Sequence, residues 1–163
     1  MVDGADYDFE KTDAGSLMVD KVSAGSLKVG GLVMIKDHPC KITSYSTAKT
    51  GKHGAAKAML TGIDILTNNK YECTYSTGDT VDAPIAKRIE YNLINVDEDD
   101  FCTLLMDSGE IKEDLKIPEE DHLKETAKRI REIFEAGTKE CIVTVLSTLG
   151  KEQIINAREG KDQ

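Results

Sequence analysis

The fold of this chain is indicated most clearly by residues 118–149, which read PEEDHLKETAKRIREIFEAGTKECIVTVLSTL. Pro118 and the acidic residues after it are typical of a helix start, and Gly137 is typical of a helix end. Between them, four apolar side chains recur at helical spacing: Leu123, Ala127, Ile130 and Phe134. The nearly continuous apolar run at residues 141–149 predicts a strand directly after this helix.

Further strand candidates lie on both sides of this segment. Three precede it, at residues 88–96, 101–106 and 111–116, with turns rich in Asp, Ser and Gly between them. One follows it, at residues 153–157, across a turn at Gly150-Lys151. Three strands, a helix and two more strands is the order of an OB-fold, a small Greek-key barrel that often binds oligonucleotides.

The first half of the chain has another series of short strand candidates, at residues 32–35, 40–45, 58–66 and 71–75. Turn residues at 37–39 and 67–69 separate them, which favours a second small barrel. Pro84 marks a short linker at about residues 81–87. Residues 1–27 lack a stable apolar period and are predicted to be a mobile acidic tail. We therefore expect a tail (1–27), a first barrel (28–84) and a second barrel (85–163) in a mainly β protein.

The charge of the chain is unevenly distributed. The formal net charge is −9, but residues 28–70 hold seven lysines against two aspartates. A basic segment within an acidic chain can still contact phosphate, while the acidic remainder suppresses indiscriminate binding. We expect a local contact with a polyanion, centred on this segment.

Composition also restricts the compartment and the kind of site. The acidic N-terminal residues lack the pattern of a secretory signal, and no apolar stretch is long enough to span a bilayer. The four cysteines form no Cys-x-x-Cys pair and have no histidine placed to complete a zinc site. We expect a cytoplasmic protein with reduced thiols, no metal and no membrane contact.

Residues 46–57, STAKTGKHGAAK, form the most informative segment for function. They have no apolar periodicity and predict an exposed loop in which Gly51 and Gly54 flank Lys52 and His53. A Walker A loop would need glycine at Ser46 and Ser or Thr at His53, so a nucleotide enzyme is not supported. No histidine of the chain lies in an identifiable nucleophile motif.

Two interpretations of this loop remain open on composition alone. It fits a basic hairpin that only improves solubility. It fits equally a loop that enters a narrow pocket, because glycine leaves no bulk beside the Lys52 amine. Lys49, Lys52 and Lys57 would add a positive field that holds the loop against a phosphate backbone.

The residues of this loop closely resemble the hypusine loop of the eukaryotic translation initiation factor 5A family. Further matches are Pro-Cys-Lys-Ile at residues 39–42, Gly-Ile-Asp-Ile at 62–65 and Asp-Ser-Gly-Glu at 107–110. The resemblance covers the chain from about residue 30 onward. Ala55 departs from the family pattern, which commonly has a second histidine there, and Ala48 is a smaller variation.

This resemblance implies an N-terminal SH3-like barrel that carries the loop, and a C-terminal OB-fold. It also implies that deoxyhypusine synthase transfers the aminobutyl group of spermidine to Lys52, and that deoxyhypusine hydroxylase then completes hypusine. The chain would be the substrate of these enzymes and not itself an enzyme. It would need no cofactor, because NAD serves the synthase. The rest of the modification and ribosome loop would comprise Lys49, Thr50, Gly51, His53, Gly54 and Lys57.

In proteins that resemble this one, the modified lysine approaches the acceptor end of peptidyl-tRNA on the ribosome. There it promotes peptide bond formation at stalled sequences such as proline runs, and the same role extends to termination. Weak homodimerisation is a further expectation. One alternative is an unmodified two-barrel RNA-binding module, although few aromatic residues are available for stacking. Another is an acidic adaptor that binds protein through the helix at residues 119–136.

Overall fold

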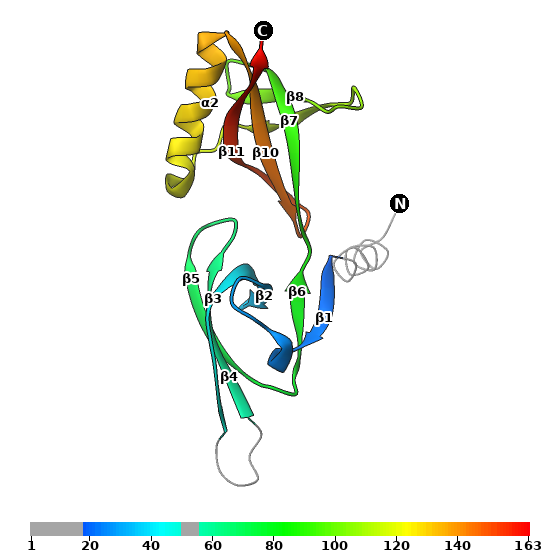
Figure 1. Ribbon diagram of the computed structural model, residues 1–163, viewed down its shortest axis with the longest axis vertical. Helices are drawn as coiled ribbons and strands as arrows, with labels where there is room; N and C mark the ends of the chain where they lie inside the picture. Colours follow the sequence, from blue (N-terminus) through cyan, green and yellow to red (C-terminus); the bar gives the residue numbers. More distant parts are fainter. Residues whose placement is uncertain (1–17, 50–55) are drawn as a thin grey trace, which may run out of the picture. The chain divides into compact units, whose positions relative to one another are not determined.

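The computed structural model describes residues 18–49 and 56–163, and these form two compact units. One unit ends at Ile85 and the next begins at Ala86. Strands dominate both units, and the described residues contain one α-helix, α2 (Figure 1). The predicted fold class, mainly β with an N-terminal SH3-like barrel and a C-terminal OB-fold, is confirmed.

The N-terminal unit is built from an antiparallel sheet in the order β2-β3-β4-β5 and a two-stranded sheet of β1 and β6. Its elements are β1 (Val19–Ser23), a 3-10 turn (Ala24–Ser26), β2 (Leu32–Ile35), β3 (His38–Lys49), β4 (Ala56–Asp64), β5 (Lys70–Ser76) and β6 (Thr80–Pro84). Alternate residues of these strands point inward, as a sheet with one buried face requires. The resulting core includes Val33, Ile35, Cys40, Ile42, Ala58, Leu60 and Val81.

The prediction of a mobile tail over residues 1–27 is wrong for residues 18–27. Val19–Ser23 pair with β6 along five residues, and Ala24 is 0% exposed. The Ala24 amide donates to the Asp79 carbonyl at 2.8 Å, and the Tyr45 hydroxyl donates to the Ala24 carbonyl at 3.1 Å. These partners lie far away in the sequence, so local composition could not indicate them. Residues 1–17 lie outside the described residues.

The boundary between the two units falls within the short linker predicted at residues 81–87, but most of this segment is strand. Strand β6 extends to Pro84 and strand β7 begins at Ala86, so Ile85 alone lies between the two strands. Pro84 is tolerated because it ends β6 in a two-stranded sheet, where its missing amide donor costs little.

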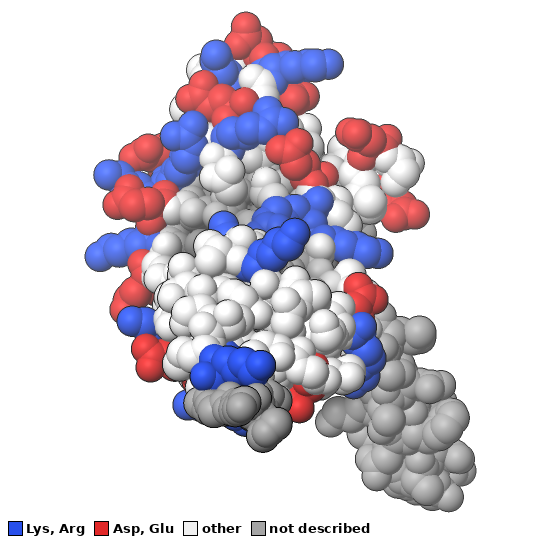
Figure 2. Space-filling model, turned by 60° about the horizontal axis from the view of Figure 1, so that its bottom comes forward, with Lys and Arg blue, Asp and Glu red and all other residues white. Residues whose placement is uncertain are grey.

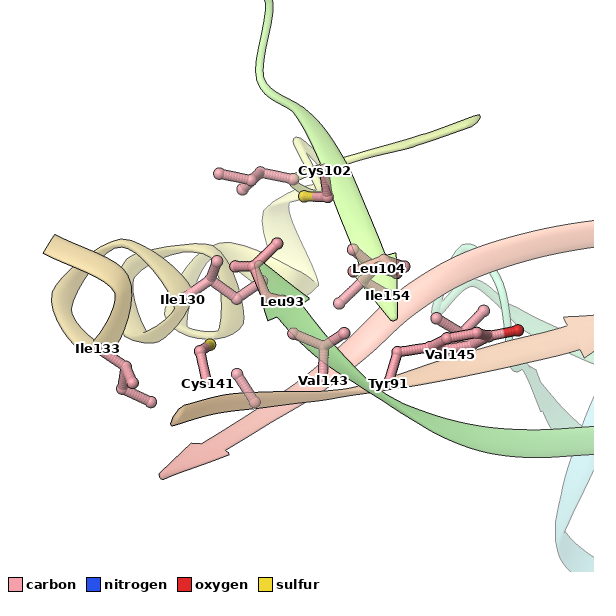
Figure 3. Close-up of a cluster of buried hydrophobic side chains, with 12 residues drawn as sticks. Tyr91, Leu93, Cys102, Leu104, Ile130, Ile133, Cys141, Val143, Val145 and Ile154 are labelled. Carbon is pink, nitrogen blue, oxygen red and sulfur yellow. The ribbon is translucent and has the colours of Figure 1, made fainter. Parts of the chain in front are cut away.

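The C-terminal unit has the sheet order β11-β10-β7-β8-β9. Its elements are β7 (Ala86–Val96), β8 (Phe101–Leu105), β9 (Ile111–Lys116), a 3-10 turn (Asp121–Leu123), α2 (Lys124–Ala136), β10 (Lys139–Thr148) and β11 (Lys151–Asp162). Figure 3 shows Ile130 and Ile133 of α2 packed with Leu93, Cys141 and other side chains of the strands. One helix thus covers the core of a five-stranded barrel, in the order that the sequence predicted.

The helix begins later than predicted. Ile117 and Pro118 are buried, and Glu120 is extended, so a 3-10 turn precedes the first residue of α2, Lys124. Burial of Ile117 keeps the chain extended past Pro118, and the helix can start only after this anchor. The predicted end is confirmed, because Gly137 caps the helix in the left-handed conformation with φ of 66°.

Gly62 lies in a tight contact in the N-terminal core, and replacing it with alanine should destabilise that unit. A Cβ atom there would lie 2.8 Å from the Cys40 Cβ and 2.9 Å from the Ile35 Cδ1. We expect Gly62→Ala to cost about 1–3 kcal/mol in urea unfolding, as overpacking does. Gly78→Ala is the matched control, since nothing lies within 4 Å of its added Cβ. Equal stability of the two variants would contradict this prediction.

Candidate functional site

The functional segment predicted from the sequence is carried by the hairpin of β3 and β4. The two strands pair in a continuous antiparallel ladder from Ser44↔Thr61 to Lys49↔Ala56. Ser46, Thr47, Ala48 and Lys49 are all exposed, so this end of the hairpin runs beyond the core. The predicted loop at residues 46–57 is therefore too long: residues 46–49 and 56–57 are strand, because backbone pairing suffices there without apolar packing.

The central residue of the predicted site, Lys52, lies outside the described residues. The same holds for four of its neighbours in the predicted loop: Thr50, Gly51, His53 and Gly54. Ala55, the departure from the family pattern, also lies in this segment. The structure thus describes the two strand ends that bracket residues 50–55, at Lys49 and Ala56.

Lys49 and Lys57 are both exposed on these strand ends, but they face opposite sides of the hairpin. Lys49 pairs with Ala56, and successive side chains alternate between the two faces of a strand. The Nζ atom of Lys57 donates to the Ser76 Oγ on β5 at 2.9 Å. A polyanion that contacts both ammonium groups must therefore reach around the hairpin.

Basic side chains gather at this end of the N-terminal unit. Figure 2 shows lysine and arginine side chains in blue beside the end of the hairpin, and blue and red side chains intermixed over the rest of the same view. Part of the lysine excess that the sequence indicated within residues 28–70 is thus exposed at the end of the hairpin, at Lys49 and Lys57. It supplies a local attraction for phosphate groups on an otherwise acidic protein.

His38, at the start of β3, belongs to a cluster that has no signal in the sequence. Its ring stacks on Tyr71 with centroids 4.2 Å apart. Its Nδ1 lies 3.0 Å from the Oδ2 of Asp64, a carboxylate that is 2% exposed. The other oxygen, Oδ1, accepts hydrogen bonds from the amides of Leu66 and Thr67. This cluster holds the β4–β5 turn, and His122 lies exposed in the 3-10 turn before α2.

The acidic run at residues 97–100 organises a turn. The Oδ1 of Asp97 accepts the amides of Asp99 and Phe101 at 2.8 and 2.9 Å. Both carboxylate oxygens of Asp100 face the guanidinium of Arg131 on α2, and this pairing lowers the pKa of Asp100. Within residues 18–49 and 56–163, no group of three or more His, Cys, Asp or Glu side chains could hold a metal ion. No described helix is long and apolar enough to cross a membrane.

The buried thiols should be slow to react. Burial raises the pKa of Cys40, Cys102 and Cys141 to about 11, because desolvation disfavours the thiolate. At pH 8 we expect their alkylation by iodoacetamide to be about 100-fold slower in the native protein than in urea, since the thiolate is the nucleophile. Mass spectrometry of timed digests measures each rate. Half-buried Cys73 should react first, and native rates equal to the rates in urea would refute the prediction.

Two family models match the chain. The model described as "Translation initiation factor 5A-like, N-terminal" matches residues 19–79. The model described as "Eukaryotic elongation factor 5A hypusine, DNA-binding OB fold" matches residues 85–158. The two barrels and the basic hairpin are thus those of a class of translation factors.

Individual relatives agree with these models. The chain is 40% identical over 154 residues to eukaryotic translation initiation factor 5A-2 of Arabidopsis thaliana, covering 94% of each chain. It is 41% identical over 150 residues to eukaryotic translation initiation factor 5A of Drosophila melanogaster, covering 92% of this chain and 91% of the relative. The solved structure of a translation initiation factor eif-5a family protein from Naegleria fowleri has a TM-score of 0.81 at 41% identity, over 86% of this chain and 99% of that one. The chain belongs to the eukaryotic translation initiation factor 5A family.

Proposed function

We propose that this translation factor acts on the cytoplasmic ribosome through a hypusine side chain formed on Lys52. The observation that carries the proposal is the exposed, regular β3–β4 ladder, whose last described pair, Lys49↔Ala56, brackets the segment containing Lys52. Such a ladder is a rigid scaffold, and regular secondary structure positions functional groups more precisely than loops do. The matched C-terminal model, whose description names hypusine, supports the same modification.

The modification would add both length and charge to Lys52. An unmodified lysine ends in one ammonium on a flexible four-carbon stem. Transfer of the aminobutyl group of spermidine by deoxyhypusine synthase adds a second amine four carbons farther out, and deoxyhypusine hydroxylase then adds a hydroxyl group. The longer side chain could reach a target that lies too deep for lysine itself.

On the ribosome, this side chain would approach the acceptor end of peptidyl-tRNA. Proline is a constrained secondary amine with a fixed φ, so proline runs place the reactants poorly. By holding the peptidyl-tRNA in position, the modified side chain would lower the entropic part of the barrier to peptide bond formation. It would assist termination in the same way. Ribosomal RNA remains the catalyst, and the factor itself is neither an enzyme nor the holder of a cofactor.

Mass spectrometry of the intact protein and of its peptides, after purification from the native source, tests the modification. We expect the peptide containing Lys52 to carry the added mass of hypusine, with fragment ions that assign it to this residue. The peptide containing Lys49 is the internal control and should have its unmodified mass. An unmodified Lys52 in protein that is active in translation would refute the proposal.

Two alternatives were open from the sequence: an unmodified RNA-binding module, and an adaptor that binds protein through its helix. Both have less support in the structure. Tyr91, one of the few aromatic residues that could stack on RNA, is 6% exposed and belongs to the core. The apolar stripe of α2 is also a core face, because Ile130 and Ile133 are buried. Comparing binding to free RNA on filters with sedimentation on ribosomes separates the proposed factor from a general RNA-binding module, which would bind both.

A further inference from the structure

The outer face of the C-terminal sheet has a groove whose floor is one row of paired residues. Leu105 on β8 pairs with Asn92 on β7, Asn92 pairs with Ile142 on β10, and Ile142 pairs with Arg158 on β11. The neighbouring residues Leu93 and Leu104 point into the core, so this row faces away from it. The row lines a groove of about 560 Å³, which we call the outer groove.

The rim of the outer groove is acidic. Four carboxylates line it: Glu90, Asp107, Glu140 and Glu159. Two basic side chains accompany them, and two of the carboxylates are already paired: Glu90 with Arg158 at 3.0 and 3.1 Å, and Glu159 with Lys139 at 3.7 Å. Asp107 is exposed on the turn after β8. The groove therefore has an excess of negative charge, within a stretch (85–163) that has twelve basic against nineteen acidic residues.

The floor of the outer groove contains a buried oxygen atom that lacks a hydrogen-bond donor among the described residues. The Oδ1 of Asn92 is buried and accepts no hydrogen bond from the described residues. A buried acceptor without a partner costs free energy, and native proteins usually satisfy it. A ligand that carries N–H donors would supply the partner while its positive charge meets the acidic rim.

An apolar ridge continues the groove along β8 and β9. Leu105 pairs with Ile111, and Ile111 is 55% exposed. The β8–β9 turn extends away from the other elements of its unit, which leaves this ridge open (Figure 1). An acidic groove beside an aliphatic ridge fits a ligand that has both cationic and aliphatic groups, and it repels phosphate.

We propose that the outer groove binds an extended basic segment of a partner protein, in which Lys or Arg alternates with aliphatic residues. Cationic side chains enter the groove between Asp107 and Glu140 and donate to Asn92. The aliphatic side chains pack on Leu105 and Ile111. This site lies on the C-terminal unit, and it depends neither on the modification of Lys52 nor on the ribosome.

Nuclear magnetic resonance of the full isotope-labelled chain tests the proposal with a synthetic peptide of alternating lysine and leucine. We expect saturable shifts of the amides of Asn92, Leu105, Ile142 and Gly160, which line the groove. A peptide of alternating glutamate and leucine, and oligouridine, should leave these amides unchanged. The double variant Asp107→Lys/Glu140→Lys should bind the basic peptide at least about tenfold more weakly, because it reverses two rim charges.

Glu125→Lys is the matched control, since Glu125 is exposed in the first turn of α2 and does not line the groove. Its affinity for the basic peptide should stay within about twofold of the parent chain, because Glu125 makes no contact in the groove and salt screens exposed charges. Shifts spread over all acidic surfaces, or equal weakening by Glu125→Lys, would show nonspecific attraction and overturn the proposal. Stronger shifts of the groove amides with oligouridine would overturn it in favour of RNA. Because the shifts are mapped on the parent chain, a double variant that fails to fold leaves the test intact.

Discussion

Replacing Lys52 with arginine should lower the stimulation of proline-run synthesis by about 100-fold or more, which is the loss expected when a positioning group is removed. Arginine keeps the positive charge, so a purely electrostatic role would survive. Its guanidinium stays protonated at pH 7 and offers no free amine to accept the aminobutyl group. The variant therefore separates charge from modification at one residue.

The measurement is translation of a reporter with a proline run in a purified system, together with transfer of labelled spermidine to the protein. Lys49→Arg is the matched control, because Lys49 is exposed at the end of the β3 ladder and the change keeps its charge. We expect this control to stay within about twofold of the parent chain, and both variants to keep its unfolding temperature, because each substitution keeps the positive charge. Full activity of Lys52→Arg would rule out an essential hypusine.

The largest effect on stability should come from Ile154→Ala in the C-terminal core. Ile154 lies on β11, pairs with Val145 and is 1% exposed. Removing its buried methyl groups loses transfer free energy and leaves a cavity, so we expect a cost of about 2–5 kcal/mol. Hydrogen exchange should accelerate along β10 and β11, whose amides belong to the same ladder.

Ile111→Ala is the control for this prediction, because it makes the same chemical change on β9 at a residue that is 55% exposed. Its cost should stay within about 0.5 kcal/mol. Urea unfolding followed by circular dichroism measures both variants. A cost below about 1 kcal/mol for Ile154→Ala would mean that the core relaxes into the space, contrary to the close packing expected of the buried cluster drawn in Figure 3.

Much of the fold could be predicted because its signals are local. The alternation along β4 places Ala58 and Leu60 inward, and Gly137 ends α2 through its own backbone freedom. The errors occurred where a distant partner decided the conformation. Residues 18–27 look like a tail until β6 pairs with them, and the start of α2 is delayed by the burial of Ile117.

The candidate site likewise has some features that the sequence indicates and others that only the structure shows. The Gly-Lys-His-Gly motif and the local excess of lysine are properties of the sequence, and they led to the correct family. The placement of Lys49 and Lys57 on opposite faces needed the β3–β4 register, because a shift of one residue moves every side chain to the other face. Neither the cluster of His38, Asp64 and Tyr71 nor the outer groove has a contiguous sequence signal.

The sequence by itself determined the order of strands and helix, the uneven charge and the motif that contains Lys52. Those features depend on neighbouring residues, whose spacing and chemistry can be read along the chain. Only the tertiary structure decided that residues 18–27 belong to the first barrel, how far the hairpin strands extend, and which side chains share the outer groove. Strand pairing brings together residues that are tens of positions apart, and the register of that pairing depends on the whole core.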